Sequence, residues 1–200
     1  MKRILITQRL DKITGRDEYR DALDARWATL LWSWGLLPVP IASGVKNATE
    51  YLSELKPDGF LLSGGNNIGE APDRDNLEYA VLDYAEEHRL PVFGVCRGLQ
   101  MMNVRQGGRL SKVEGHVATR HLITEYLTGR ERMVNSYHNA GVHQQDLGRE
   151  LQVLATSSDG CVESLKHINL PWLAIMWHPE REKIADSLDK QLIINHLSKL

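Results

Sequence analysis

The chain has 200 residues, which fits one ordinary domain with a sizeable core, and its 24 basic and 26 acidic residues give a net charge of −2. With 42% hydrophobic and 25% charged residues, the composition is typical of a globular protein and argues against a disordered tail, a collagenous repeat or a basic nucleic-acid binder. We therefore expect one domain over residues 1–200.

Apolar periodicity predicts alternating strands and helices over the first half of the chain. The predicted strands are residues 2–7, 36–41, 59–63 and 91–95, and the predicted helices are residues 17–34, 48–55, 75–88 and 97–105. The first of these helices rests on a stripe of Tyr19, Leu23, Trp27, Leu30 and Trp34, with Gly35 as a natural end. This order calls for right-handed crossovers and an α/β fold in which helices flank a mostly parallel central sheet.

The second half of the chain is richer in short predicted strands. These are residues 109–113, 132–136, 151–156, 161–167 and 172–177. We expect them to form additional antiparallel strands of the sheet or a small side sheet. An amphipathic helix is predicted over residues 183–197, with an apolar stripe of Ile184, Leu188, Leu192, Ile193 and Leu197.

Cys96 lies in a G-x-C-x-G turn between a predicted strand and a predicted helix. This is the nucleophile-elbow arrangement with sulfur in place of a hydroxyl, and Gly94 and Gly98 keep side chains out of its tight backbone. A thiolate at a helix start is favoured by the unsatisfied N–H groups there. We interpret Cys96 as a nucleophile rather than a buried structural cysteine. Cys161 has no such setting and is interpreted as structural.

His178 and Glu180 follow the last predicted strand. A thiolate nucleophile needs a general base, which in turn needs an orienting group. The two residues are two positions apart, so an extended backbone places both side chains on the same side, and Pro179 between them cannot donate to a sheet ladder. A lone His-x-Glu would be interpreted as an ordinary surface pair, but beside a cysteine elbow it is a candidate for the rest of a triad.

Further segments occur in one order around these residues. They are Ser63-Gly64-Gly65-Asn66, Gly94 to Gln100, Met102-Asn103, Gly107-Gly108-Arg109-Leu110, Asn135-Ser136-Tyr137-His138 and Trp177-His178-Pro179-Glu180. Together they span most of the chain and resemble the class I glutamine amidotransferase superfamily, and within it the group of free-standing γ-glutamyl hydrolases. The resemblance implies a flavodoxin-like α/β fold.

The resemblance also implies roles for individual residues. Cys96 would be the nucleophile, His178 the general base and then acid, and Glu180 its orienting partner. The backbone N–H groups of Gly65 and Arg97 would form an oxyanion hole. The side chains that would hold the glutamyl group are Gln100, Ser136, Tyr137 and His138.

The implied reaction is hydrolysis of a γ-glutamyl amide with release of glutamate, and among the group's activities the resemblance favours γ-glutamyl-CDP-amidate as substrate, giving cytidine diphosphoramidate for capsule biosynthesis. Basic residues near the end of the first strand would suit such a diphosphate, although basic loop residues are more often only solvated. They are Arg9, Lys12, Arg16 and Arg20. A γ-glutamyl-γ-aminobutyrate or folate-type hydrolase, and the glutaminase subunit of a two-component amidotransferase, remain open.

No metal or cofactor is expected, because His116, His121, His138 and His143 have no cysteine pairs nearby and no H-E-x-x-H motif. Two cysteines are too few for a disulfide-stabilised secreted chain, and the apolar N-terminal run is too short for a signal peptide, so we expect a cytoplasmic protein. The uncharged residues 27–45 are broken by Gly35 and prolines, which argues against a membrane helix. The expected partner is a small γ-glutamyl amide, not nucleic acid or membrane, with a homo-oligomer left open.

Overall fold

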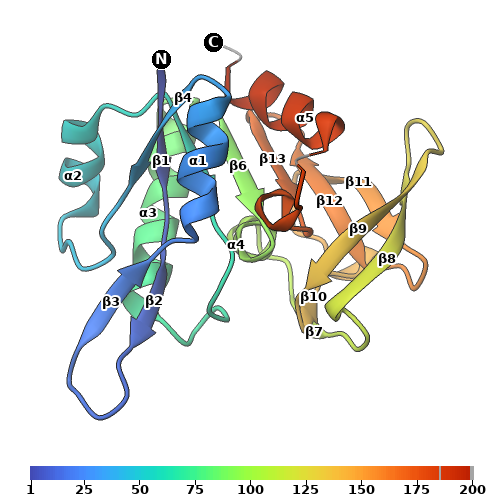
Figure 1. Ribbon diagram of the computed structural model, residues 1–200, viewed down its shortest axis with the longest axis horizontal. Helices are drawn as coiled ribbons and strands as arrows, with labels where there is room; N and C mark the ends of the chain where they lie inside the picture. The colour runs from blue at the N-terminus through green and yellow to red at the C-terminus, as the bar shows by residue number, and fades with distance from the viewer. Residues whose placement is uncertain (185, 199–200) are drawn as a thin grey trace.

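The computed structural model describes residues 1–184 and 186–198. Among them, the central sheet has nine strands in the order β4-β1-β5-β6-β13-β12-β11-β8-β9 (Figure 1). The parallel half consists of β4 (Leu36–Pro40), β1 (Lys2–Ile6), β5 (Gly59–Leu62), β6 (Val92–Val95) and β13 (Trp172–Ile175). The antiparallel half consists of β12 (Val162–His167), β11 (Leu151–Ser157), β8 (Val117–Glu125) and β9 (Glu131–Tyr137). The predicted α/β fold with a parallel centre and added antiparallel strands is confirmed.

Helices cover both faces of the parallel half, as right-handed crossovers require (Figure 1). Helices α1 (Ala25–Ser33) and α5 (Ser187–Leu197) lie on one face. Helices α2 (Ala48–Leu55), α3 (Pro72–Glu87) and α4 (Arg97–Arg105) lie on the other. None of the helices in the described ranges is both long enough and apolar enough to span a bilayer.

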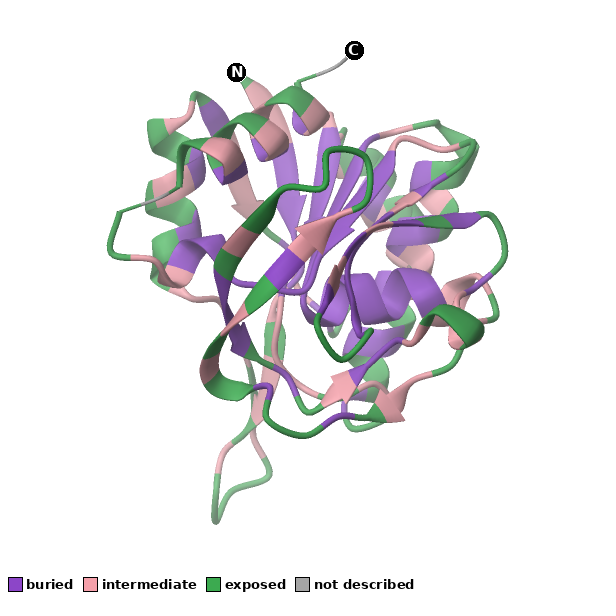
Figure 2. Ribbon diagram, turned by 90° about the vertical axis from the view of Figure 1, so that its right-hand side faces the viewer, coloured by how far each residue is buried: buried purple, intermediate pink, exposed green. Residues whose placement is uncertain are grey.

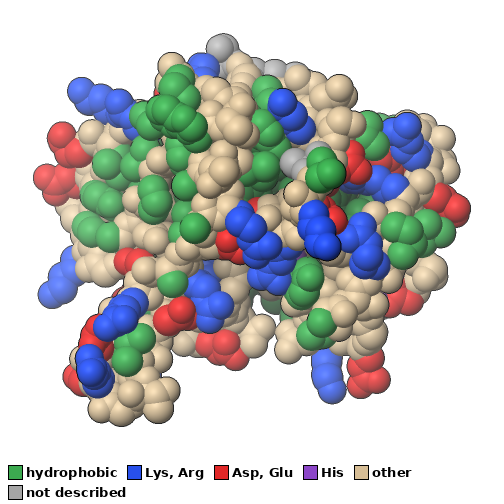
Figure 3. Space-filling model, viewed as in Figure 1, with side chains coloured by type: hydrophobic (Ala, Val, Ile, Leu, Met, Phe, Trp, Pro, Cys, Tyr) green, Lys and Arg blue, Asp and Glu red, His purple; other side chains and the backbone are tan. Residues whose placement is uncertain are grey.

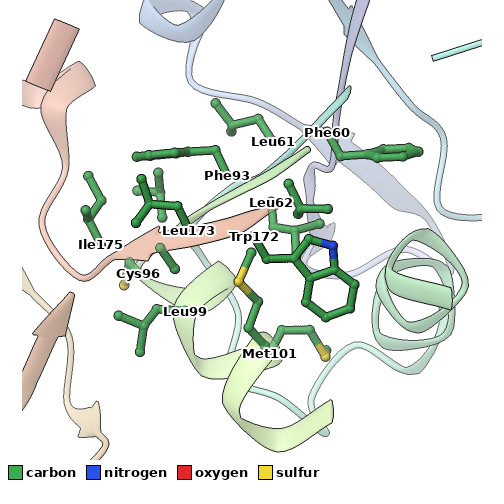
Figure 4. Packing of buried hydrophobic residues seen from close by; sticks show 14 of the residues in the cluster. Phe60, Leu61, Leu62, Phe93, Cys96, Leu99, Met101, Trp172, Leu173 and Ile175 are labelled. Carbon is green, nitrogen blue, oxygen red and sulfur yellow. The ribbon is translucent and has the colours of Figure 1, made fainter. Parts of the chain in front are cut away.

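The core explains why the central strands are continuous apolar runs rather than alternating ones. All residues of β5, β6 and β13 are buried, because both faces of these strands lie under helices (Figure 2). Trp172 of β13 lies beside Met101 of α4 (Figure 4). The ring of Phe60 lies near that of Tyr84 in α3, and the ring of Phe93 lies near that of His196 in α5. This packing fixes the carboxyl ends of β5, β6 and β13 at one edge of the sheet.

The predicted helix over residues 17–34 is wrong in its first half. Strands β2 (Arg9–Lys12) and β3 (Tyr19–Ala22) form a projecting hairpin instead, and Tyr19 is 56% exposed (Figure 1). Helix α1 begins at Ala25 because the Asp24 carboxylate accepts a hydrogen bond of 3.0 Å from the Arg26 N–H. Of the residues of the predicted apolar stripe, only Trp27 and Leu30 lie within α1.

The second half departs from prediction in three places. Strand β8 was not predicted. Of residues 109–113, only β7 (Ser111–Lys112) is a strand, and it pairs with β10 (Ala140–Gly141) in a small side sheet. The last helix begins at Ser187, after its cap Asp186, so the prediction from residue 183 starts too early; Ile184 is 87% exposed, and residue 185 of that prediction lies outside the described residues. Short 3-10 turns lie at Gln144–Asp146 and Pro179–Arg181.

Candidate active site

Cys96 occupies a sharp turn between β6 and α4, at the carboxyl edge of the sheet. Its φ of 51° lies in the left-handed region that side chains other than glycine rarely adopt. A Cβ on Gly94 would lie 2.7 Å from the carbonyl carbon of Gly98, and a Cβ on Gly98 would lie 2.5 Å from the oxygen of Leu62. Because neither glycine has a side chain, the backbone at Gly94 packs against Gly98, and Gly98 packs against Leu62 of β5.

His178 and Glu180 form a buried pair beside Cys96. His178 Nδ1 lies 2.7 Å from Glu180 Oε1. The backbone of His178 is held from β9, because Asn135 donates its side-chain amide to the His178 carbonyl and accepts from the His178 N–H, each at 2.8 Å. A Cβ on Gly64 would lie 2.7 Å from His178 Cε1 and 3.7 Å from Cys96 Cβ. Because Gly64 has no side chain, the His178 imidazole and the Cys96 side chain can both lie close to its backbone.

The electrostatics of this pair favour a protonated imidazole. Burial lowers the pKa of His178, but the interactions with the Cys96 sulfur and the Glu180 carboxylate outweigh burial and raise that pKa to about 9. His178 Nε2 makes no hydrogen bond within the described residues, so this nitrogen remains available to exchange a proton at the Cys96 side. The structure thus brings together all three residues that the motifs singled out.

A buried ion network supports the two predicted backbone donors. Arg74 donates to the Gly65 carbonyl at 2.8 Å and to the Ser63 carbonyl at 2.7 Å, which holds the loop after β5. The Arg97 side chain pairs with Asp75 and Glu78, which holds the first turn of α4. Glu78 also accepts from Arg74 at 2.9 Å, so one carboxylate joins the two loops.

Sequence reasoning missed this network. Buried charges persist only where they are paired, and the Arg74 and Glu78 side chains are fully buried. Their spacing of four residues, at the start of the helix predicted over residues 75–88, is a weak signal that they pair. Nothing in the spacing indicates that Arg97 joins them from another helix. Asn135 belongs to the motif over residues 135–138, but that motif does not indicate that its side chain holds the backbone of His178.

The predicted substrate residues fall into two groups. Gln100, Tyr137 and His138 line a cavity of about 330 Å³ that also contains Cys96. Tyr137 is 41% exposed and its ring lies edge-on to His178, with centroids 5.6 Å apart. The Gln100 side-chain amide donates to the Ala140 carbonyl at 2.8 Å, so part of its hydrogen-bonding capacity is already used within the protein. Ser136 is fully buried and donates to the His116 carbonyl at 2.6 Å, away from the cavity lining.

Of the basic residues of the first loop, Arg9 lies at the site. It lines the Cys96 cavity and a second cavity beside His178, and it pairs with Asp11 at 2.7 Å. Arg16 and Arg20 both pair with Glu18 farther out on the hairpin.

Lysine and arginine side chains also gather between the hairpin and the antiparallel half (Figure 3). Arg181 lies 4.3 Å above the ring of Tyr137 and lines the second cavity.

Comparison with known proteins identifies relatives of this chain. The glutamine amidotransferase-like protein YvdE of Lactococcus lactis is 31% identical, over 78% of each chain. The γ-glutamyl-CDP-amidate hydrolase of Campylobacter jejuni is 30% identical, over 88% of this chain and 89% of that enzyme. The carbamoyl phosphate synthase small chain of Symbiobacterium thermophilum is 32% identical, but this chain covers only 39% of it.

Solved structures share the fold at low identity. A Thermoplasma acidophilum protein described as a GMP synthase component has a TM-score of 0.75 at 21% identity, covering 99% of this chain and 93% of the other. A glutamine amidotransferase of Thermotoga maritima has a TM-score of 0.67 at 12% identity, covering 90% and 76%. Residues 37–199 match the family described as glutamine amidotransferase class-I. The chain belongs to the class I glutamine amidotransferases.

Proposed function

We propose that the protein hydrolyses a γ-glutamyl amide, with Cys96 as nucleophile, His178 as base and then acid, and Glu180 as the group that orients His178. The observation that carries this proposal is the strained elbow of Cys96 beside the hydrogen-bonded His178–Glu180 pair. Hydrolase activity also fits the similarity to a γ-glutamyl-CDP-amidate hydrolase along most of the chain.

The proposed reaction has two halves. His178 takes the proton of the Cys96 thiol and Cys96 Sγ attacks the γ-carbonyl carbon. The C–N bond breaks as His178 gives this proton to the departing nitrogen. A γ-glutamyl thioester remains. His178 then takes a proton from water as the water oxygen attacks the thioester carbon, the C–S bond breaks, and glutamate leaves with the Cys96 thiolate restored.

The tetrahedral intermediates would be stabilised by the N–H groups of Gly65 and Arg97. Arg97 is the first residue of α4, where an N–H has no partner within the helix. Arg74 and Glu78 hold the two loops that carry these donors. Removing one such donor typically costs about 3 to 4 kcal/mol of transition-state stabilisation.

Gly64→Ala is expected to lower kcat/KM at least about 100-fold, because the added methyl displaces His178 and misplacement of a catalytic group by roughly 1 Å has this effect. The matched control is Gly44→Ala, because no heavy atom lies within 4 Å of a Cβ at Gly44. Glutamate release and thermal melting of both variants are compared with the wild type. Unchanged kcat/KM in a folded Gly64→Ala protein contradicts a role for His178 in turnover.

For the substrate, we propose γ-glutamyl-CDP-amidate or a closely related phosphate-bearing γ-glutamyl amide. The leaving group would lie toward Arg9 and Arg181, which line the cavity beside His178. The glutamyl group would lie toward Gln100, Tyr137 and His138, with Ser136 behind them. Cytidine diphosphoramidate for capsule biosynthesis would be the product, made in the cytoplasm.

Arg9→Met is expected to raise KM for γ-glutamyl-CDP-amidate about tenfold or more, because one hydrogen bond to a charged group is lost. KM for γ-glutamyl-γ-aminobutyrate should change little, since that substrate carries no phosphate. Arg16→Met, on the same hairpin but outside both cavities of the site, serves as the control. Equal effects of Arg9→Met on both substrates exclude a phosphate-binding role for Arg9.

Comparison of four substrates separates the proposed activity from its alternatives. These are γ-glutamyl-CDP-amidate, γ-glutamyl-γ-aminobutyrate, glutamine and a folate polyglutamate. Preference for γ-glutamyl-γ-aminobutyrate or the folate indicates another γ-glutamyl hydrolase. The similarity to carbamoyl phosphate synthase small chains favours a second candidate, a glutaminase that serves a separate synthase. Low activity on all four substrates with strong activation by an added synthase supports that candidate.

A further inference from the structure

A buried carboxylate outside the Cys96 site is surrounded by three histidines. Glu163 of β12 is fully buried, and its Oε1 lies 3.6 Å from His116 Nδ1 and 3.5 Å from His138 Nε2. Its Oε2 lies 3.3 Å from His121 Nε2. Within the part of the chain that the structure describes, neither oxygen of Glu163 nor His121 Nε2 has a hydrogen bond. Burying polar atoms without hydrogen-bond partners costs free energy, so we expect a further group to bind these atoms.

The opposite edges of two of these rings show what kind of partner fits. His116 Nε2 lies 2.8 Å from Asp159 Oδ2, and His138 Nδ1 lies 3.0 Å from the Ala140 carbonyl. Each of these outward nitrogens faces an acceptor and therefore carries the hydrogen. In neutral rings, the inward nitrogens of His116 and His138 then both present lone pairs, although they are only 3.2 Å apart. Two lone pairs and a carboxylate oxygen that lie 3.2 to 3.6 Å from one another repel unless a cation lies between them.

The dimensions fit a tetrahedral metal ion. His116 Nδ1, His138 Nε2 and Glu163 Oε1 form a triangle with sides of 3.2, 3.5 and 3.6 Å. Zinc bound to nitrogen and oxygen at its usual distances has ligand-to-ligand edges of roughly 3.3–3.5 Å. The contacts to Asp159 and Ala140 are of the outer-shell kind that fixes the orientation of histidine ligands. A ring nitrogen of His121 lies within 4.8 Å of ligand atoms of His116 and Glu163 and can supply a fourth position. Cys161 Sγ lies within the same distance of ring nitrogens of His116 and His138 and is the alternative to His121.

We propose that His116, His121, His138 and Glu163 bind one Zn²⁺ ion. The absence of a metal motif led to the opposite expectation, because these ligands come from separated segments that only the antiparallel half of the sheet brings together. His116 precedes β8, His121 lies in β8, His138 follows β9, and Glu163 lies in β12. No short spacing in the sequence records this arrangement.

The position of the ion gives it a structural role. Strand β8 pairs with β11 only from Ile123 to Glu125, so its earlier residues diverge from that neighbour. An ion bound by His116, His121 and Glu163 ties this part of β8 to β12. The remaining ligand of the set, His138, lines the Cys96 cavity, so the ion also fixes one wall of that cavity.

Titration with Zn²⁺ against a chromogenic chelator tests the proposal on the full chain. The wild type should bind one Zn²⁺ per chain. Glu163→Gln should weaken binding more than about 100-fold, since even outer-shell changes cost roughly 10- to 100-fold, and His121→Asn should weaken it at least about tenfold. His88→Gln, an exposed histidine at the end of α3, should not change the affinity. Circular dichroism establishes that each variant is folded, and His121→Asn remains informative if Glu163→Gln is not.

Two further measurements guard against the wrong site. In Cys96→Ser, which removes the thiol beside His178, Zn²⁺ binding should persist; its loss places the ion at the Cys96 site and overturns the proposal. Co²⁺ bound to Cys96→Ser should show tetrahedral visible bands without a thiolate charge-transfer band, and such a band assigns Cys161 in place of His121. Equal affinities of the wild type and folded Glu163→Gln also overturn the proposal, since a shared proton then serves as the cation.

Discussion

Cys96→Ala is expected to lower glutamate release from the preferred γ-glutamyl amide at least about 10⁴-fold, because no other group can form the thioester and loss of a nucleophile has effects of this order. The fold should persist, since the substitution removes only one sulfur atom that faces a cavity. Steady-state kinetics and thermal unfolding of the purified variant measure the two effects separately.

Cys161→Ala is the matched control for this experiment. The Cys161 thiol is buried, and burial raises its pKa to about 12, so it is not a thiolate at neutral pH. Its removal should leave kcat nearly unchanged. Turnover by Cys96→Ala comparable to that of Cys161→Ala is incompatible with the proposed nucleophile.

His178→Ala is expected to slow turnover by about 10⁴- to 10⁶-fold, whereas Glu180→Gln should cost at least about tenfold less. The difference follows from their contacts, since His178 moves protons at Cys96 and Glu180 acts only through its 2.7 Å contact with His178 Nδ1. Measurement of kcat and kcat/KM for both variants on the same substrate gives the ranking.

The double variant makes this test sharper. Residues that act as one unit have non-additive effects, so His178→Ala/Glu180→Gln should be no slower than His178→Ala. An additive loss in the double variant, or a Glu180→Gln variant as slow as His178→Ala, is inconsistent with Glu180 as an orienting residue and favours direct contact with substrate.

The parallel half of the fold was predictable because its strands are apolar throughout. Residues 59–62 and 92–95 are covered on both faces, and burial of such runs leaves a strong pattern in the sequence. The β2–β3 hairpin and β8 leave no such pattern. Most of their positions are exposed or half-buried, and charged side chains on the hairpin pair with one another rather than with the core.

The proximity of Cys96, His178 and Glu180 was anticipated for a different reason. Cys96 lies in a strand-to-helix turn, and His178 and Glu180 lie at a strand end that contains a proline. The backbone of both segments is confined to few conformations, so their local geometry can be predicted from the sequence. Groups that act through long-range contacts were not found. Arg97 and Glu78 are 19 positions apart, and Asn135 and His178 are 43 apart, so only the folded sheet shows that they meet.

The shared carboxylate of Glu78 constrains how this site can change during evolution. Because Arg74 and Arg97 both bind it, substitution of either arginine alters the partner of the other and leaves charge unpaired in the interior. Mutational effects at Arg74, which holds the loop after β5, and at Arg97 in the cysteine elbow should therefore be epistatic. Lineages that reshape one loop are expected to carry a compensating change in the other, so the two segments diverge together.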